Sequence, residues 1–299
     1  MKNQFKILSG LLLVALIIWF LVLNQKPGRI LEADFLDVGQ GDAILIKTPK
    51  GQTMLIDGGP DNKILEKLGE YLSPLKKRID IIILTHPHAD HVTGLIEVLR
   101  RYDVGLVVLN GVYLKTDNYD QFLKAIEDNE VKVLIAAAGD AIHFDSPAGE
   151  LEFDIISPDE NLNGSVFNKN SENFGAGGND VNDTSIVGKL VYNDFSIMFM
   201  GDATLKVENR LLVYSNGLKS DVLKVGHHGS KYSSLTSFLG AIDPEAGIIE
   251  AGAKNFYGLP SLATLSRLGM FNINIFRTDQ NGDIRILSDG FTTSIYKEK

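Results

Sequence analysis

Two short histidine clusters, each directly after an apolar, β-branched run, constrain this chain more than any other feature. The first reads His86-Pro87-His88-Ala89-Asp90-His91 and the second is His227-His228. Between them in the chain lies a third motif, the acidic Met200-Gly201-Asp202-Ala203. A divalent ion needs neutral imidazole or anionic oxygen ligands on rigid elements, with a coordination position left open for water. Histidine and carboxylate gathered at strand ends therefore predict a hydrolytic site for two metal ions.

The first cluster divides into two pairs of predicted ligands. On extended backbone, residues i and i+2 point the same way, so His86 and His88 can reach one ion. Asp90 and His91 come where the chain enters a helix and can serve a second ion. Asp202 follows a strand and can bridge both ions with one oxygen each.

The second cluster offers one ligand and one catalytic group. If the backbone there is extended, adjacent side chains face opposite ways, so a single histidine ligates. We expect His227 to be the ligand, whereas His228 reaches the substrate or shuttles a proton, with Asp90 as the second catalytic residue. His143 has no comparable context and is expected to be a partly buried structural histidine.

Strand and helix patterns alternate from Ile30 to the end of the chain without a clear linker. This texture predicts a single α/β domain in layers over residues 29–299. The stretch from Asp159 to Asn182 departs from it, because it is rich in Asn, Gly and Ser. A structureless loop of this length is either disordered or functional, for example as a mobile lid.

The N-terminal residues 1–28 are expected to form a membrane anchor with a short linker. Ile7 to Leu23 is almost uninterrupted apolar sequence behind Lys2 and Lys6, at the short end of the roughly 17–25 residues that a bilayer span needs. The exit from this run lacks the small residues of a signal-peptide cleavage site, which favours one uncleaved transmembrane helix over a signal peptide or a buried core helix. The flanking charges weakly favour an extracytoplasmic catalytic domain.

Charge and cysteine content exclude some classes. The formal net charge of −9 argues against broad electrostatic capture of nucleic acid, although it leaves room for a nuclease with a locally positive site. The absence of cysteine excludes disulfides, cysteine-ligated zinc and a thiol nucleophile.

The motif His-x-His-x-Asp-His after a strand, with Gly-Asp and a later histidine, resembles the metallo-β-lactamase superfamily. Several stretches are similar to the C-terminal hydrolase domain of ComEC/Rec2-type competence proteins, which act in DNA uptake. They are Phe35-Leu36-Asp37-Val38-Gly39-Gln40-Gly41-Asp42-Ala43, Leu55-Ile56-Asp57-Gly58-Gly59, Asp221–Ser230 (DVLKVGHHGS) and Arg277-Thr278-Asp279. The resemblance implies a four-layer αββα sandwich with metals at the loop edges of the two sheets. The sequence does not include the large membrane region of the competence proteins, so we expect that this chain does not form the DNA channel itself.

The chain departs from the superfamily at one ligand position. The third ligand of the first metal is usually a histidine about twenty residues before Gly-Asp, and this sequence has Val181-Asn182-Asp183-Thr184-Ser185 there. Asp183 is the natural oxygen ligand, with Asn182 as its competitor. An oxygen-rich site moves the preference from zinc toward manganese, although either fits, and makes β-lactam hydrolysis less expected.

Further residues are expected around the metals or at the substrate. Asp57 can orient a ligating histidine, or it can be a turn carboxylate that caps Gly58-Gly59. Gln40 and Asp42 lie in a Gly-spaced turn that can approach a substrate closely. A phosphate can be contacted by Lys224, Ser230 and Lys231, unless Lys224 is simply solvated.

The function expected from these observations is metal-dependent hydrolysis of a phosphodiester by a membrane-anchored enzyme. The substrate is DNA, possibly single-stranded, or another phosphodiester such as a cell-wall ester. Hydrolysis of an amide, lactone or thioester by the same site is an alternative. A second alternative is a membrane-tethered module that binds a partner without catalysis.

Overall fold

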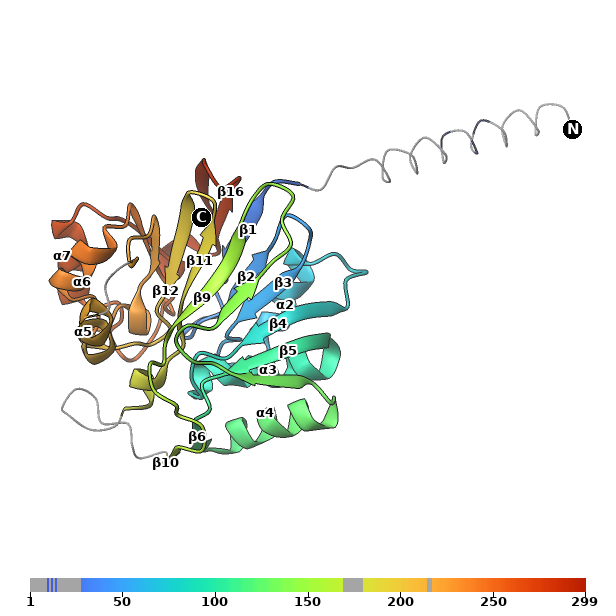
Figure 1. The fold of residues 1–299 in the computed structure, drawn as a ribbon, viewed down its shortest axis with the longest axis horizontal. Coiled ribbons are helices and arrows are strands. Elements are labelled where there is room, and N and C mark those ends of the chain that lie inside the picture. Colours follow the sequence, from blue (N-terminus) through green and yellow to red (C-terminus); the bar gives the residue numbers. More distant parts are fainter. Residues whose placement is uncertain (1–9, 11, 13, 15–27, 169–179, 214–216) are drawn as a thin grey trace, which may run out of the picture.

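Two mixed β-sheets face each other and carry helices on their outer sides, which gives the expected four layers (Figure 1). The computed structural model describes residues 10, 12, 14, 28–168, 180–213 and 217–299. The predicted anchor, residues 1–28, lies almost wholly outside the described residues. Within the described part of the chain, no helix is long and apolar enough to span a bilayer.

The first sheet has eight strands, antiparallel at one end and parallel from its fifth strand onward. In spatial order they are β17 (Thr293–Lys297), β16 (Ile284–Ser288), β1 (Leu31–Phe35), β2 (Ile44–Lys47), β3 (Thr53–Ile56), β4 (Arg78–Ile83), β5 (Asp103–Leu109) and β7 (Lys132–Ile135).

The second sheet has seven strands with the same division into an antiparallel and a parallel half. In spatial order they are β15 (Asn274–Arg277), β14 (Ala246–Ile249), β13 (Val222–Lys224), β12 (Phe195–Phe199), β11 (Val187–Tyr192), β9 (Leu151–Ser157) and β8 (Ala141–His143). Because carboxyl ends of parallel strands share one edge, the ends of β3, β4, β12, β13 and β14 supply the loops where a ligand is expected.

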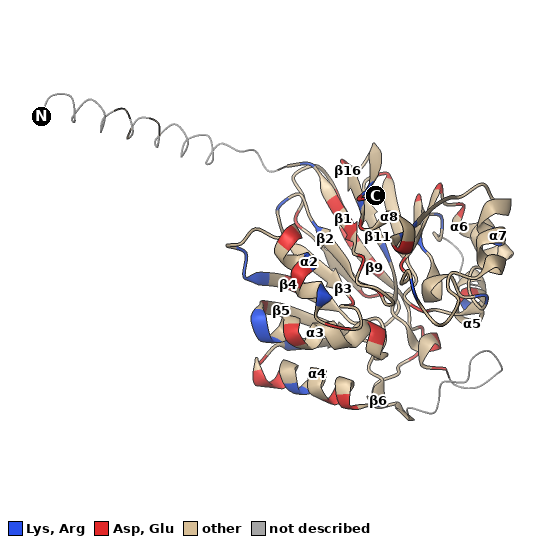
Figure 2. Cartoon of the chain, turned by 180° about the vertical axis from the view of Figure 1, so that it is seen from behind, with Lys and Arg blue, Asp and Glu red and all other residues tan. Residues whose placement is uncertain are grey.

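The helices cover the outer face of each sheet. Three pack on the first sheet: α2 (Lys63–Tyr71), α3 (Ala89–Arg101) and α4 (Asp117–Asp128). Three pack on the second: α5 (Leu205–Val213), α6 (Thr236–Ile242) and α7 (Leu262–Met270). The short α8 (Thr278–Asn281) follows β15. Acidic and basic side chains are interspersed along α2, α3 and α4 (Figure 2), as expected for a solvated outer layer.

Alternating side chains divide the apolar residues of the first sheet between two cores. Ile44 and Ile46 of β2 face the second sheet, whereas Leu45 between them packs with the helices. This period of two is what a strand buried on both faces requires. The central core between the sheets also holds the stacked rings of Phe35 and Phe199, whose centroids are 6.2 Å apart.

Most elements lie where the sequence patterns place them, but short or atypical ones were missed. Strands β6 (Tyr113–Lys115), β8, β10 (Val166–Asn168) and β17, and helix α7, were not predicted. The stretch 159–182 was expected to be structureless, yet β10 pairs with β6 and a 3₁₀ turn forms at Val181–Thr184. Of the stretch 159–182, which was also considered as a possible lid, residues 169–179 lie outside the described residues.

Replacing Gly94 by alanine is expected to lower the free energy of unfolding by about 1–3 kcal/mol. A Cβ there would lie 2.0 Å from the carbonyl oxygen of Gly58 and 2.7 Å from that of Asp61, so α3 would have to move. Chemical denaturation measures the loss. The control is Gly69→Ala in α2, where a Cβ meets nothing within 4 Å and helix propensity predicts a small gain. Equal stability of the Gly94 variant and the wild type would contradict this close approach.

Candidate metal centre

The first cluster lies where β4 ends and α3 begins. His86 is fully buried, and its Nε2 lies 3.1 Å from Nδ1 of His88. Asp90 and His91 occupy the first turn of α3, with the backbone of His88 still extended (ψ 152°) at the helix start. The predicted change from extended chain to helix within the cluster is therefore present.

Asp57, at the end of β3, holds this segment from beneath. Its carboxylate accepts hydrogen bonds from the Thr85 amide (2.8 Å) and hydroxyl (2.7 Å), and it lies 2.8 Å from Nδ1 of His91. The bond to Nδ1 turns Nε2 of His91 toward the cluster, which is the orienting role expected of an outer carboxylate. Asp57 thus fits the first of its two predicted roles, since its bonds go to Thr85 and His91.

The second sheet brings Asp202 to the same point. Asp202 follows β12 and is buried, and its Oδ2 lies 3.4 Å from Nε2 of His91 and 3.9 Å from Nε2 of His86. The same oxygen lies 3.4 Å from Nε2 of His228 and 3.9 Å from Nε2 of His227. One carboxylate oxygen is therefore central to four imidazoles from both sheets.

The second histidine pair does not have the extended backbone expected from the sequence. His227 and His228 have φ values of 49° and 50°, in the left-handed region, within the tight turn Gly226–Gly229. This turn places both rings on the cluster rather than on opposite sides. Nε2 of His228 lies 3.3 Å from Asp90 Oδ2, while its Nδ1 lies 2.9 Å from the carbonyl oxygen of Glu250. His228, rather than the preferred His227, has the geometry of a second-ion ligand with its opposite nitrogen fixed.

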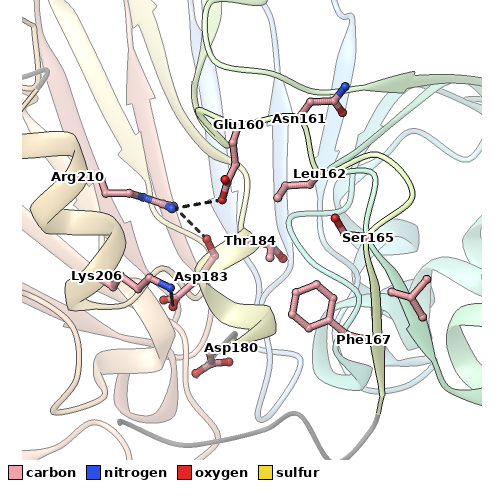
Figure 3. A pocket seen from close by; sticks show the side chains of 11 residues that line it. Glu160, Asn161, Leu162, Ser165, Phe167, Asp180, Asp183, Thr184, Lys206 and Arg210 are labelled. Carbon is pink, nitrogen blue, oxygen red and sulfur yellow. Dashed lines mark hydrogen bonds and ion pairs between the residues drawn. The ribbon is translucent and has the colours of Figure 1, made fainter. Parts of the chain in front are cut away.

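The structure separates Asn182 from Asp183. Asn182 is buried and lines the pocket above the histidines, and its Oδ1 has no hydrogen-bond partner. Asp183 instead lines a neighbouring pocket beside Lys206 (Figure 3), with its carboxylate 3.3 Å from Nζ of that lysine. The carboxylate also accepts a hydrogen bond from the hydroxyl of Thr204. The expected ligand Asp183 therefore points away from the cluster, because adjacent side chains of this turn face different pockets.

A buried ion-pair network lies under the second histidine pair. Lys224 in β13 is 1% exposed and pairs with the carboxylate of Asp42, with Glu250 Oε2 4.0 Å away. Asp42 Oδ1 lies 3.1 Å from Nδ1 of His228. The sequence analysis expected Lys224 either to contact a phosphate or to be solvated. Both expectations are wrong, because Lys224 is buried and paired with Asp42. Asp42 supports the cluster from below instead of contacting a substrate.

The acidic surroundings change the protonation of the cluster. Burial alone would lower the pKa of His91, but the carboxylates of Asp202, Asp57 and Asp90 outweigh it and hold that pKa well above its usual value. The same balance, with Asp202 and Asp42, raises the pKa of His228. Burial opposes ionisation of Asp202, yet the neighbouring imidazoles keep its pKa well below the ordinary range. The buried carboxylates therefore select positive charge at this point, which a divalent ion supplies.

The fit to metal ions rests on buried atoms that lack hydrogen-bond partners. Five such atoms belong to side chains of the cluster: His88 Nε2, His91 Nε2, His228 Nε2, Asn182 Oδ1 and Asp202 Oδ1. Unpaired buried nitrogen and oxygen atoms are costly and rare. Ligand atoms of His86, His91 and Asp202, and those of Asp90, His91 and His228, each lie within 4.8 Å of one another. These overlapping sets of histidine and aspartate atoms are candidate ligands for a divalent metal ion.

The cluster opens into a pocket of about 540 Å³. Among the predicted substrate-facing residues, Gln40, Asp90, Ser230 and Lys231 line it. Gly41 has φ +144°, and a Cβ there would lie 2.2 Å from the Asp90 carbonyl oxygen, so the Gly-spaced turn packs against the start of α3. His143 lies elsewhere, in β8, and is exposed rather than partly buried, 3.3 Å from Glu152.

Several residues of the site were not singled out from the sequence. Glu250 directly follows β14. Its position at the carboxyl end of a parallel strand is the signal that could have identified it as a residue of the site. Thr85, between β4 and His86, binds Asp57 through a hydroxyl that no motif distinguishes. Tyr232 and Tyr257 line the pocket from loops and carry no signal in a single sequence.

Comparison with known proteins agrees with this geometry. The model of the metallo-beta-lactamase superfamily matches residues 36–252. The chain is 27% identical over 271 residues to ComE operon protein 3 of Bacillus subtilis, covering 85% of this chain and 32% of that protein. It is 27% identical over 289 residues to recombination protein 2 of Haemophilus influenzae, covering 95% of this chain and 32% of that protein.

The chain spans about a third of the length of these curated relatives. Among solved structures, a mutant of the CmlA beta-hydroxylase is similar in fold, with a TM-score of 0.50 and 13% identity, over 85% of this chain and 53% of that one. The family match covers most of the chain, and the histidine and aspartate cluster lies within it. The chain therefore belongs to the metallo-beta-lactamase superfamily, as a metal-dependent hydrolase related to competence proteins.

Proposed function

We propose that this chain hydrolyses phosphodiesters at a centre of two divalent ions. The observation that carries the proposal is the convergence of unpaired, buried ligand atoms from both sheets on one open pocket. The first ion would be held by His86, His88 and Asn182, and the second by Asp90, His91 and His228. Asp202 would contribute to both. Such ions lower the pKa of a water, polarise the phosphoryl group and stabilise the leaving oxygen.

The residues of the chain orient these ligands and the substrate. Asp57 fixes His91, and the Glu250 carbonyl fixes His228, so both rings present Nε2 to Asp202 in the cluster. Ser230 and the exposed Lys231 border the pocket and can bind the phosphoryl oxygens. His227 lines the same pocket and is placed to exchange a proton with the leaving oxygen. These roles reverse the sequence-based assignment of the adjacent histidines.

A substrate panel tests the proposal against its alternatives. The metal content of the full chain is measured first, and hydrolysis is then followed with bis-p-nitrophenyl phosphate, single-stranded DNA and nitrocefin. We expect close to two bound ions and cleavage of both phosphodiesters. Cleavage of nitrocefin alone would favour amide or lactone hydrolysis, and bound metal without any turnover would favour a binding module.

The third ligand position separates Asn182 from Asp183. Asn182→Ala should lower hydrolysis by about 10- to 100-fold, as loss of a metal-site contact typically does. Asp183→Ala should have a smaller effect, because its carboxylate binds Thr204 and Lys206 outside the centre. An oxygen ligand from Asn182 also predicts faster turnover with Mn²⁺ than with Zn²⁺. A larger loss for the Asp183 variant, measured at saturating metal, would restore Asp183 as the ligand.

We further propose that residues 7–23 anchor the chain in a membrane, with the catalytic domain outside the cytoplasm. The support is the apolar run and its charged flanks. The full chain should fractionate with membranes at its unprocessed mass, and protease added to intact cells should digest the catalytic domain. Digestion only after lysis would place that domain in the cytoplasm.

A further inference from the structure

The loop that follows β14 carries two large aromatic side chains into solvent, one of them at the edge of the metal pocket and the other directly before it in the chain. Phe256 is fully exposed (102%) and Tyr257 is 68% exposed, and Tyr257 lines the pocket together with Gly258 and Leu259. Large aromatic rings exposed at the rim of a pocket are typical of ligand-binding sites, because aromatic side chains without such a role are usually buried.

Hydrogen bonds hold this loop in one conformation. The side-chain amide of Asn255 donates to the carbonyl oxygens of Gly252 (2.8 Å) and Leu259 (2.7 Å), and its oxygen accepts from the Leu259 amide (2.9 Å). At one end, the Gly252 amide donates to Oε1 of Gln40 (3.1 Å). At the other end, the Ser261 amide donates to the carbonyl oxygen of Gly229 (2.9 Å).

Both ends of this loop are thus fixed to turns that border the metal centre. Phe256 and Tyr257 therefore lie on a loop that these hydrogen bonds hold in one conformation. Little conformational entropy of the loop is lost when a ligand ring binds there.

Positive charge accompanies the aromatic rings. Lys231 lines the pocket next to Tyr232, with Nζ 4.9 Å from the centroid of that ring, and Lys254 lies exposed two residues before Phe256. Among the described residues, no carboxylate forms an ion pair with either lysine. Rings interleaved with unpaired cations are the combination that binds single-stranded polynucleotides, where bases stack and phosphates meet the charge.

We propose that Phe256 and Tyr257 form a stacking subsite for the nucleobase next to the scissile phosphodiester, with Lys231 and Lys254 on the flanking phosphates. The inference rests on the proposed phosphodiester hydrolysis and adds a specificity-determining site to it. Stacking on an aromatic side chain tolerates any base, so the subsite selects single-stranded polymer without reading its sequence.

The test compares two oligonucleotides of equal length and charge, one with thymine bases and one with abasic sugars. In the full chain, Phe256→Ala and Tyr257→Ala should each raise KM for the thymine oligonucleotide by about 5-fold or more. They should leave the abasic oligonucleotide unchanged. Lys231→Ala and Lys254→Ala should weaken both substrates alike. Phe291→Ala, an equally solvent-exposed aromatic on another face, and Lys124→Ala on α4 are the matched controls.

Equilibrium binding of fluorescent oligonucleotides, measured with chelator present, separates the subsite from the chemistry. Base-dependent binding that the aromatic variants lose supports the subsite even if no strand is cleaved, an outcome that would defeat only the proposed hydrolysis. Equal affinity of wild type and both aromatic variants for the thymine strand overturns the inference. It is overturned equally if Phe256→Ala abolishes binding to anionic lipid vesicles and leaves strand binding intact, because the rings would then serve a membrane.

Discussion

Asp202→Ala is expected to lose most bound metal and to slow hydrolysis by roughly 10³-fold or more, the effect of removing several kcal/mol of transition-state stabilisation. The physical reason is the central position of its Oδ2, which lies 3.4 Å from both His91 and His228. No other described carboxylate approaches imidazoles of both histidine clusters this closely in such number. Elemental analysis and initial rates with bis-p-nitrophenyl phosphate measure the two effects.

Two controls make the Asp202 result specific. Asp202→Asn keeps the shape and one oxygen, so it should retain the fold and some metal while still losing most activity. Asp80→Ala removes a carboxylate that binds Thr53 and Arg78 away from the pocket, and it should keep the metal content. If the Asp202→Ala variant kept the metal content and the hydrolysis rate of the wild type, the cluster would not be a metal centre.

Lys224→Met is expected to lower the free energy of unfolding by about 3–5 kcal/mol, the usual result of breaking a buried ion pair from one side. Methionine keeps most of the side-chain volume, but it leaves Asp42 buried at 1% exposure without its cation. Chemical denaturation, with the metal content held fixed, measures the change.

A variant of an exposed ion pair and a double variant serve as controls for the Lys224 result. Lys124→Met breaks a surface pair with Asp128 and should cost less than about 1 kcal/mol. Adding Asp42→Asn to Lys224→Met should recover part of the loss, because the unpaired charge is then removed. A Lys224 variant as stable as the Lys124 variant would mean that this buried network contributes no net stability.

The layered fold could be predicted from the sequence because hydrophobic periodicity reports burial directly. Strand β12 is buried along its whole length and β4 ends in the apolar run Ile81–Ile83, while α3 repeats apolar residues at helical spacing. Short edge strands such as β8 and β10 bury too little side chain to leave this signal. Helix α7 was missed because only part of its nine residues is buried.

The metal ligands were also readable, but their pairing was not. The positions of the histidines and of Asp202 after apolar strands follow from the chain itself, since parallel strands end at one edge of a sheet. How the side chains of His227 and His228, and of Asn182 and Asp183, are directed at that edge depends on the φ and ψ angles of two tight turns. His227 and His228 both have left-handed backbone angles, which turn both rings toward the cluster, and no residue type at these positions requires such angles.

Sequence by itself thus determined the fold class, the family and the strand ends from which the ligands come, because composition and spacing decide which segments are buried. The tertiary structure alone decided the rest. It buried Lys224 beside Asp42, directed Asp183 to a neighbouring pocket and placed Tyr257, next to the exposed Phe256, in the lining of the metal pocket. These placements depend on contacts between residues as far apart in the chain as Asp42 and Lys224, or Gln40 and Gly252, whose meeting no local pattern encodes.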